Sequence, residues 1–165
     1  MRGGFWALLL ILWAAPGLAQ PVLGEGVIPP WSASQQRAAE ILSHATLASV
    51  IALDTLDSWR ADDRRAAFAL EAARLGSVWL ATRLLKSALD RMRPCAPACG
   101  LEDAAASFPS GHTAFAASAV GGAPLVVTLP LSASTGYFRI MAWKHWLTDT
   151  LAGWVIGAAV GQWLR

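Results

Sequence analysis

The stretch Pro109-Ser110-Gly111-His112 organises the chain, because it separates a loop from a long apolar run that opens at Thr113. Ser110 is a favourable N-cap residue, since its side-chain oxygen accepts a backbone N–H of a first helical turn. The backbone N–H groups that follow then form an anion site, to which the helix dipole adds, and Gly111 lets a ligand approach closely. His112 adds a titratable imidazole at the same place. The stretch therefore indicates either a phosphate site with a proton donor or an ordinary capped helix that carries a histidine.

Two further clusters of charged residues flank this stretch. Upstream, Lys86 is followed after six residues by Arg93-Pro94. Downstream, Arg139 is followed after five residues by His145 and after three more by Asp149. Lys86 and Arg93 are seven residues apart, so two helical turns place them on one face. Taken alone, such charges are typical of a solvated helix end, and it is the order of all three clusters that favours a shared site.

The three clusters together resemble the tripartite signature of the type 2 phosphatidic acid phosphatase (PAP2) superfamily. That signature is a Lys, six residues and Arg-Pro; then Pro-Ser-Gly-His; then Ser-Arg, five residues, His, three residues and Asp. The chain departs from it at Phe138, where the family usually has Ser, and this puts one hydrogen bond to phosphate in doubt. The resemblance runs from about Ala66 to the C-terminus, and order, spacing and residue type agree along it.

The resemblance implies a role for each motif residue. His145 is the nucleophile that forms a phosphohistidine, Asp149 orients its ring, and His112 protonates the leaving group and then activates water. The groups that hold the phosphate are Lys86, Arg93, Ser110, Gly111 and Arg139. No metal and no other cofactor is required, because side chains supply the positive charge. The spacing supports part of this assignment, since His145 and Asp149 would share a face if a helix began there.

The composition favours a membrane protein or an unusually apolar helical bundle. Of the 165 residues 55% are hydrophobic and 15% are charged, and the mean hydropathy is +0.44. A typical soluble domain carries about 25% charged residues. The net charge of +2 is too small to indicate nucleic-acid binding. The nine tryptophans indicate either an interfacial belt or a Trp-filled core; several are near the ends of apolar runs (Trp31, Trp59, Trp143, Trp146 and Trp163).

The N-terminal segment has the pattern of an export signal. Residues 1–19 combine Arg2 with an apolar run and small residues before Gln20. An uncleaved membrane helix is the rival interpretation, although the run is short for a span, which needs about 20 apolar residues. Residues 20–34 are rich in proline and glycine and read as a linker, and residues 35–165 as one helical domain.

The apolar patterning predicts an all-α fold, a compact bundle of about five helices after the N-terminal segment. The helices are expected over residues 33–56, 66–89, 110–131, 137–144 and 145–164. A charged turn is expected over residues 58–65 and another turn over residues 132–135. The run Gly121-Gly122-Ala123-Pro124 should kink or interrupt the third helix. Small residues in the last helix should allow close packing.

Several polar residues lie outside the three clusters. His44 belongs to no motif, and we interpret it as a packed or surface histidine. Glu71 and Arg74 are spaced to pair on one helix. Cys95 and Cys99 would form a local disulfide in an exported protein, or remain as two free thiols, and they are a poor metal site.

The charge distribution predicts an orientation in a membrane. If each apolar run crosses, the arginines after the first helix lie on the cytoplasmic side and the three clusters lie outside. However, only 26 residues (113–138) separate His112 from Arg139, whereas two full crossings need about 40. We therefore expect an inner-membrane protein of bacterial type with its site facing the periplasm, partly embedded, or a compact periplasmic domain after signal cleavage.

The predicted function is that of a metal-independent phosphatase acting on a lipid phosphate or pyrophosphate. The family implies phosphatidate, phosphatidylglycerophosphate, polyprenyl pyrophosphate and lipid A phosphates as candidate substrates, and the apolar composition favours a lipid. A soluble periplasmic acid phosphatase of the same superfamily is the nearest alternative. A vanadium-dependent haloperoxidase fits less well, because the chain is short and apolar for that group. A non-catalytic membrane bundle would require a degenerate site, and all the charged motif residues are present.

Overall fold

A computed structural model of the chain describes residues 31–96, 99 and 104–164. This part of the chain contains five helices and no strand. The helices are α2 (Ala33–Arg60), α3 (Arg64–Leu89), α5 (Gly111–Ser118), α6 (Leu125–Met141) and α7 (Leu147–Trp163). The prediction of an all-α bundle of about five helices is confirmed. The predicted export signal and most of the predicted linker lie outside the described residues, although Ala33 and Ser34 at its end already belong to α2.

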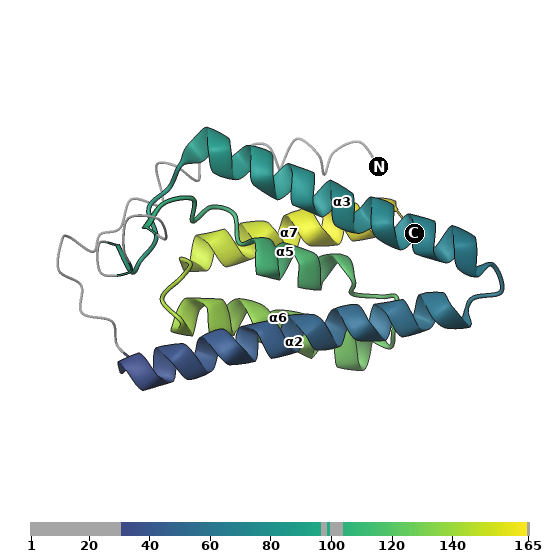
Figure 1. Cartoon of the computed structure of the whole chain (residues 1–165), viewed down its shortest axis with the longest axis horizontal. Coiled ribbons are helices and arrows are strands. Elements are labelled where there is room, and N and C mark those ends of the chain that lie inside the picture. Colours follow the sequence, from purple (N-terminus) through teal and green to yellow (C-terminus); the bar gives the residue numbers. More distant parts are fainter. Residues whose placement is uncertain (1–30, 97–98, 100–103, 165) are drawn as a thin grey trace. The chain divides into compact units, whose positions relative to one another are not determined.

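The short helix α5 is at the centre of the arrangement. It contacts each of the other four helices, with α3 and α7 on one side and α2 and α6 on the other (Figure 1). Thr113, Ala114 and Ser118 on it are all buried. Since α5 begins directly after Ser110, the position of its first turn within the bundle determines where His112 lies.

The helices α2 and α3 are each longer than their sequence patterns predicted. The expected turn over residues 58–65 shrinks to 61–63, because Asp63 caps α3 by accepting a hydrogen bond from the Ala66 N–H at 3.0 Å. The guanidinium of Arg64 lies over the Trp59 ring, 4.9 Å from its centroid, which helps to close the hairpin. At the other end of α2, Ser32 forms a capping box with Gln35.

The sequence prediction for α6 was partly wrong. The chain is interrupted at residues 121–124 as expected, but the predicted turn at 132–135 and the separate short helix at 137–144 do not exist, because α6 runs unbroken from Leu125 to Met141. The hydroxyl of Thr135 donates a hydrogen bond to the Leu131 carbonyl at 3.0 Å and contacts the hydroxyl of Thr46 on α2 at 2.9 Å. Hydroxyl residues satisfied in this way remain compatible with a helix.

The helices α5 and α7 pack closely through small residues, as the sequence predicted. A Cβ added at Gly157 would lie 2.0 Å from the Ala114 carbonyl oxygen, and one at Gly161 would lie 2.4 Å from that of Ser118. The core is correspondingly made mostly of small and hydroxyl residues. None of the tryptophans in the described part of the chain is buried, so a Trp-filled core is excluded there.

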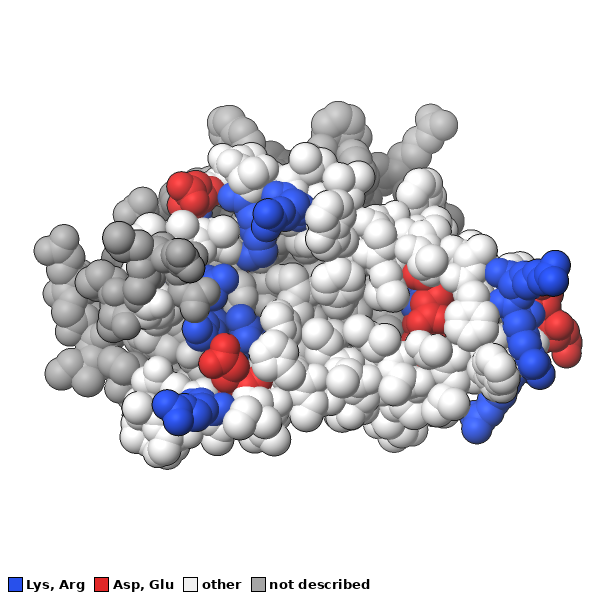
Figure 2. Space-filling view, in the orientation of Figure 1, with Lys and Arg blue, Asp and Glu red and all other residues white. Residues whose placement is uncertain are grey.

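The outer surface carries many large apolar side chains. Ile41, Trp79, Leu84, Val126 and Leu151 are each more than half exposed. In Figure 2 the lysines and arginines gather toward the two ends of the visible face, and the surface between them is mostly uncharged. By length and composition, α2 is the one helix of the described chain that could cross a membrane, and 22% of its apolar window is buried.

A buried ion pair joins α2 to α3 away from the motif residues. Arg74 pairs with Asp54, and both side chains are less than 10% exposed. Glu71 accepts a hydrogen bond from Thr55 at 2.6 Å. These two contacts join α2 to α3, and the pairing of Glu71 with Arg74 on one helix stays a prediction. Asp54 also lies against Gly122, where an added Cβ would meet its carboxylate oxygen at 2.0 Å.

Candidate active site

The N-terminus of α5 is fixed to the start of α7 by backbone contacts. Ser110 is the N-cap of α5, as predicted, and its hydroxyl accepts from the Thr113 N–H at 3.5 Å. The backbone N–H of Ser110 donates to the Asp149 carbonyl at 2.9 Å. His112 and Asp149 therefore each occupy the first turn of a helix, at neighbouring helix ends.

Asp149 is the most heavily hydrogen-bonded side chain of the site. It is fully buried and receives Arg91 Nη1 at 2.6 Å, Ser107 Oγ at 2.5 Å and the Trp146 backbone N–H at 2.9 Å. Burial alone would raise the pKa of this carboxyl, but the contact with His145, the hydrogen bonds from Ser107 and Trp146 and the charge of Arg91 outweigh it and lower the pKa. Asp149 is therefore held as a carboxylate.

His145 lies directly before α7 and not on it, because α7 begins at Leu147 with Trp146 as its N-cap. The expectation that His145 and Asp149 share a helical face is wrong, but the chain still brings His145 Nδ1 to 3.6 Å from Asp149 Oδ2. His145 is 3% exposed. Burial lowers its pKa to about 4, against the opposing effect of the Asp149 contact and helped by the charge of Arg139. The imidazole is thus neutral, with Nε2 on the side away from Asp149.

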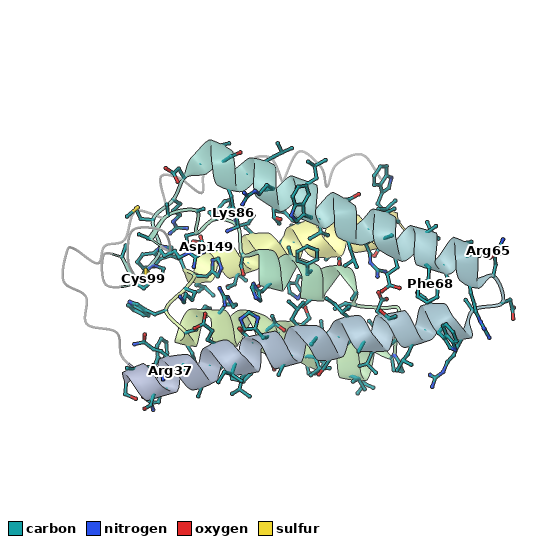
Figure 3. All side chains as sticks on the ribbon, in the orientation of Figure 1. Arg37, Arg65, Phe68, Lys86, Cys99 and Asp149 are labelled. Atoms are coloured by element: carbon teal, nitrogen blue, oxygen red, sulfur yellow. A yellow bond between two sulfur atoms is a disulfide. The ribbon has the colours of Figure 1, made fainter. Side chains whose placement is uncertain are left out.

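Three predicted phosphate-binding cations come from three different segments. Lys86 is in the last turn of α3, Arg93 is in the following loop, and Arg139 is in the last turn of α6, where it is 4% exposed. The ammonium of Lys86 donates a hydrogen bond to the Ala106 carbonyl. Burial first, and then the charges of Arg93 and Arg139, lower the pKa of Lys86 to about 8, against the opposing effect of Asp149. Figure 3 shows Lys86 and Asp149 at the same end of the bundle.

His112 faces the same group of charges. Its pKa is lowered to about 3 by burial first and then by Arg139, His44, His145 and Lys86. Its Nε2 lies 3.2 Å from Nδ1 of His44 on α2, and the two rings meet edge to face with centroids 4.7 Å apart. The structure therefore brings residues of all three sequence clusters together.

Two residues of this site were missed by the sequence analysis. His44 belongs to no motif, and Arg91 lies between the motif residues Lys86 and Arg93 without being one of them. Only their contacts with His112 and with Asp149 reveal them, because both contacts join segments far apart in the chain. The signal available in the sequence was that the chain has three histidines, and the third belongs to neither histidine motif.

The electrostatics of the site favour an anion. Lys86, His112 and His145 all have lowered pKa values, and positive neighbours contribute to each shift. A bound phosphate would offset that mutual repulsion and raise all three pKa values. The N-terminus of α5 adds backbone N–H groups, including that of Gly111, to the same region.

The loop after α3 contains a disulfide and is hydrogen-bonded to the N-cap residue of α7. Cys95 and Cys99 are joined by a disulfide, with their Cα atoms 5.4 Å apart. Trp146 Nε1 donates to the Met92 carbonyl at 2.9 Å. Phe138, at the position where the family usually has Ser, is half-buried with its ring beside that of Tyr137. Phe138 has no hydroxyl to donate to a phosphate.

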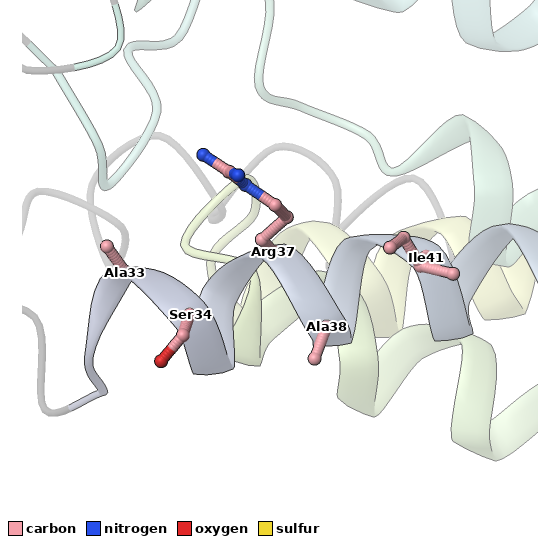
Figure 4. Close-up of a pocket in the computed structure, with 5 residues that line it drawn as sticks. All are labelled: Ala33, Ser34, Arg37, Ala38 and Ile41. Carbon is pink, nitrogen blue, oxygen red and sulfur yellow. The ribbon is translucent and has the colours of Figure 1, made fainter.

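A separate pocket of about 490 Å³ lies along the first turns of α2 (Figure 4). It is lined by Ala33, Ser34, Arg37, Ala38 and Ile41. Arg37 is the one charged residue among these five, so the lining contains no pair of groups for acid–base chemistry. Elsewhere in residues 31–96, 99 and 104–164, no group of three or more His, Cys, Asp or Glu side chains is arranged to hold a metal ion.

Comparison with known proteins agrees with this geometry. No curated protein matches the chain. Among solved structures, the fold is similar to that in the crystal structure of Aquifex aeolicus LpxE, with a TM-score of 0.61 and 20% identity over 82% of this chain and 87% of that one. A sequence model of the PAP2 superfamily matches residues 66–165, more than half of the chain, and this range includes all three motif clusters. The chain therefore belongs to the PAP2 superfamily.

Proposed function

We propose that the protein is a phosphatase that hydrolyses a lipid phosphate or pyrophosphate through a phosphohistidine on His145. The observation that carries this proposal is the arrangement of His145, with Nδ1 toward Asp149, among the cations that lower its pKa. A neutral imidazole with one nitrogen directed to a carboxylate offers its other nitrogen as a nucleophile. Membership of the PAP2 superfamily supports a phosphatase activity.

In the first step, Nε2 of His145 attacks phosphorus in line with the leaving oxygen. The bond between phosphorus and that oxygen breaks, the electron pair stays on the oxygen, and His112 gives it a proton. Lys86, Arg93 and Arg139 hold the other phosphate oxygens, and Asp149 stabilises the positive charge that develops on the His145 ring. A phosphate dianion raises the pKa of His112 from its low value in the empty site, so that the ring carries the proton it donates.

In the second step, His112 takes a proton from water and the water oxygen attacks phosphorus. The bond between phosphorus and Nε2 of His145 breaks, and inorganic phosphate is released. Both histidines return to their starting protonation states, so that the cycle consumes only water. In this proposal the side-chain cations stabilise the negative charge of the transition state. In other phosphatases a metal ion provides that stabilisation.

The exposed apolar surface supports a lipid as the substrate and a membrane as the location. Large exposed apolar patches mark interaction or membrane surfaces in folded proteins. Trp79, Leu84 and Val126 are each more than half exposed. The site residues Lys86, His112 and Arg139 lie in terminal turns of α3, α5 and α6. The arginines at the opposite end of α2 and the start of α3 fit the cytoplasmic side, so the site would face the periplasm.

The extent of embedding differs among the helices. α5 has 8 residues and spans only about 12 Å, whereas a bilayer core is about 30 Å thick. α6 and α7 have 17 residues each, close to the lower limit for a span. The proposal is therefore a bundle that is partly embedded, with α5 inside the protein and the lipid headgroup reaching the first turn of α5 from the side.

The test is phosphate release in detergent from a panel of lipid phosphates, with a metal chelator present. Wild type is compared with His145→Ala and Arg139→Ala. Arg37→Ala serves as the control, because it removes an exposed cation from the first turns of α2 that is not one of the site residues. We expect release that survives the chelator, is lost in the two site variants and is retained in the control.

Other outcomes would point to other functions. Release that needs a metal, or persists in His145→Ala, would contradict the phosphohistidine route. Preference for a soluble phosphomonoester in the absence of detergent would favour a periplasmic acid phosphatase. Halide oxidation with vanadate and peroxide would favour a haloperoxidase, and phosphate binding without any release would favour a non-catalytic bundle.

A further inference from the structure

His44 and His112 form a contact pair in the site, and the sequence motifs include only His112. His44 is in the fourth turn of α2, 68 residues before His112. Its Nδ1 lies 3.2 Å from His112 Nε2, within hydrogen-bond distance, and the rings are inclined by 68°. His44 is exposed, so its other nitrogen can reach water, whereas His112 is partly buried behind it.

A hydrogen bond between two imidazoles constrains the protons on both. One nitrogen must carry a proton and the other must offer a lone pair. The pair accommodates one additional proton readily, but two adjacent imidazolium ions would repel each other. The ring that shares this bond also has a fixed orientation, which an unrestrained surface histidine lacks.

The other groups facing His112 cannot replace this contact. From α3, α6 and the segment before α7 respectively, Lys86, Arg139 and His145 face it, and His44 faces it from α2. Lys86 and Arg139 are donors only, with no lone pair to accept an N–H from His112. His145 is already directed to Asp149.

We propose that His44 is a positioning residue that holds the ring of His112 through the hydrogen bond at His112 Nε2, which leaves Nδ1 of His112 to give and take the catalytic proton. The inference rests on the proposed phosphatase function, in which His112 gives a proton to the leaving oxygen and takes one back from water. His44 forms no bond to phosphorus and keeps its own proton throughout. It acts by fixing the direction in which His112 presents its proton, and it replaces the carboxylate that orients many catalytic histidines.

The leaving group provides a readout that a structural role would not move. An alkyl phosphate needs a proton on its leaving oxygen, whereas a nitrophenyl phosphate leaves without one. General acid catalysis contributes about 10²- to 10⁴-fold, so His112→Ala should lower kcat by such a factor for the alkyl substrate. We expect His44→Ala to lower kcat for the alkyl phosphate about tenfold, with KM and the nitrophenyl rate nearly unchanged.

Two further variants make this comparison specific. His44→Asn places an amide where Nδ1 was and should restore most of the alkyl-phosphate rate. Ser49→Ala, on the same helix, removes a hydroxyl that bonds only to the Ala45 carbonyl and should match wild type. Equal losses on both substrates in His44→Ala, or no loss on either, would overturn the proposal.

An independent measurement does not depend on turnover. The chain has three histidines, so their ring resonances can be assigned by single substitutions and followed against pH by NMR in detergent. Because His44 is among the groups that affect the pKa of His112, and its Nδ1 lies 3.2 Å from His112 Nε2, replacement of His44 by Ala should move the His112 titration. An unchanged His112 titration would overturn the pairing. If His145→Ala loses phosphate release while His44→Ala keeps the wild-type rate on the alkyl phosphate, this inference fails and the proposed function stands. If no variant or wild type releases phosphate, the proposed function fails, and the NMR result alone decides the pairing.

Discussion

Arg91 Nη1 lies 2.6 Å from Asp149 Oδ1, so an arginine of the loop after α3 forms an ion pair with the buried carboxylate at the start of α7. The same nitrogen donates to Thr148 Oγ1 at 2.7 Å, and the guanidinium lies over the Trp146 ring. Asp149 in turn faces His145. The loop that precedes the motif arginine Arg93 is therefore connected to the proposed nucleophile through one carboxylate.

Replacing Arg91 tests this connection. In Arg91→Ala, Asp149 loses one of the groups that lower its pKa, so the pKa of the carboxyl should rise. A carboxylate is lost as pH falls through its pKa, so the acid limb of the kcat profile should move to higher pH. We also expect kcat near neutral pH to fall about tenfold, equivalent to ~1.4 kcal/mol in the barrier. Arg91→Lys should recover part of the rate, and an unchanged acid limb in Arg91→Ala would contradict the role.

The pKa of Lys86 predicts how substrate binding depends on pH. With a pKa of about 8 in the empty site, Lys86 is positive below that pH and loses its charge above it. We expect kcat/KM to decline as pH rises above about 8, through an increase in KM. Lys86→Arg should lack this decline, because a guanidinium stays protonated over the whole range. The same alkaline limb in both proteins would show that another group titrates there.

The space around two glycines predicts different effects of substitution: Gly157 lies in the close contact of α5 with α7, and Gly76 lies on α3. In Gly157→Ala the new Cβ would lie 2.0 Å from the Ala114 carbonyl oxygen, so the helices must move apart. Overpacking of this kind costs about 1–3 kcal/mol of stability. At Gly76 nothing lies within 4 Å, so Gly76→Ala should be neutral or stabilise by up to about 1 kcal/mol. Thermal unfolding in detergent measures both, and equal melting temperatures would contradict the packing described.

The ion pair between Arg74 and Asp54 predicts a stability effect without a catalytic one. Removing one partner leaves a buried charge without compensation, which costs about 3–5 kcal/mol. Arg74→Ala should therefore unfold at a much lower temperature than the double variant Asp54→Asn/Arg74→Met. Arg74 lies about 18 Å along α3 from Lys86, so the folded fraction should keep its kcat. A single variant as stable as the double one would show that the pair carries no net stabilisation.

Much of the fold could be predicted from the sequence because its signals are local. Apolar runs, the Ser110 cap and the break at residues 121–124 depend on neighbouring residues, and the structure has helices, that cap and a break at those places. The turn expected at 132–135 is absent because Thr135 finds its partners in Leu131 and, across the bundle, in Thr46. Such a partner cannot be read from the sequence around Thr135.

The residues of the site likewise fall into those that the sequence motifs indicated and those that only tertiary contacts reveal. The spacing of the motifs indicated Lys86, His112 and His145 as candidates, and the structure places their charges within mutual reach. The contacts of His44 and Arg91 depend on tertiary packing, which brings α2 to α5 and the loop after α3 to α7. The position of His145 before α7 was also missed, because the sequence pattern does not distinguish the N-cap from the residue that precedes it.

The most direct test of the account is to trap the covalent intermediate. The enzyme is mixed with a ³²P-labelled lipid phosphate, quenched in alkali within one turnover, and its peptides are analysed by mass spectrometry. The account predicts a phosphoryl group that is stable in alkali and labile in acid, located on His145, and its absence in His145→Ala. Label on another residue, or rapid phosphate release with no labelled enzyme at any time, would contradict the phosphohistidine mechanism.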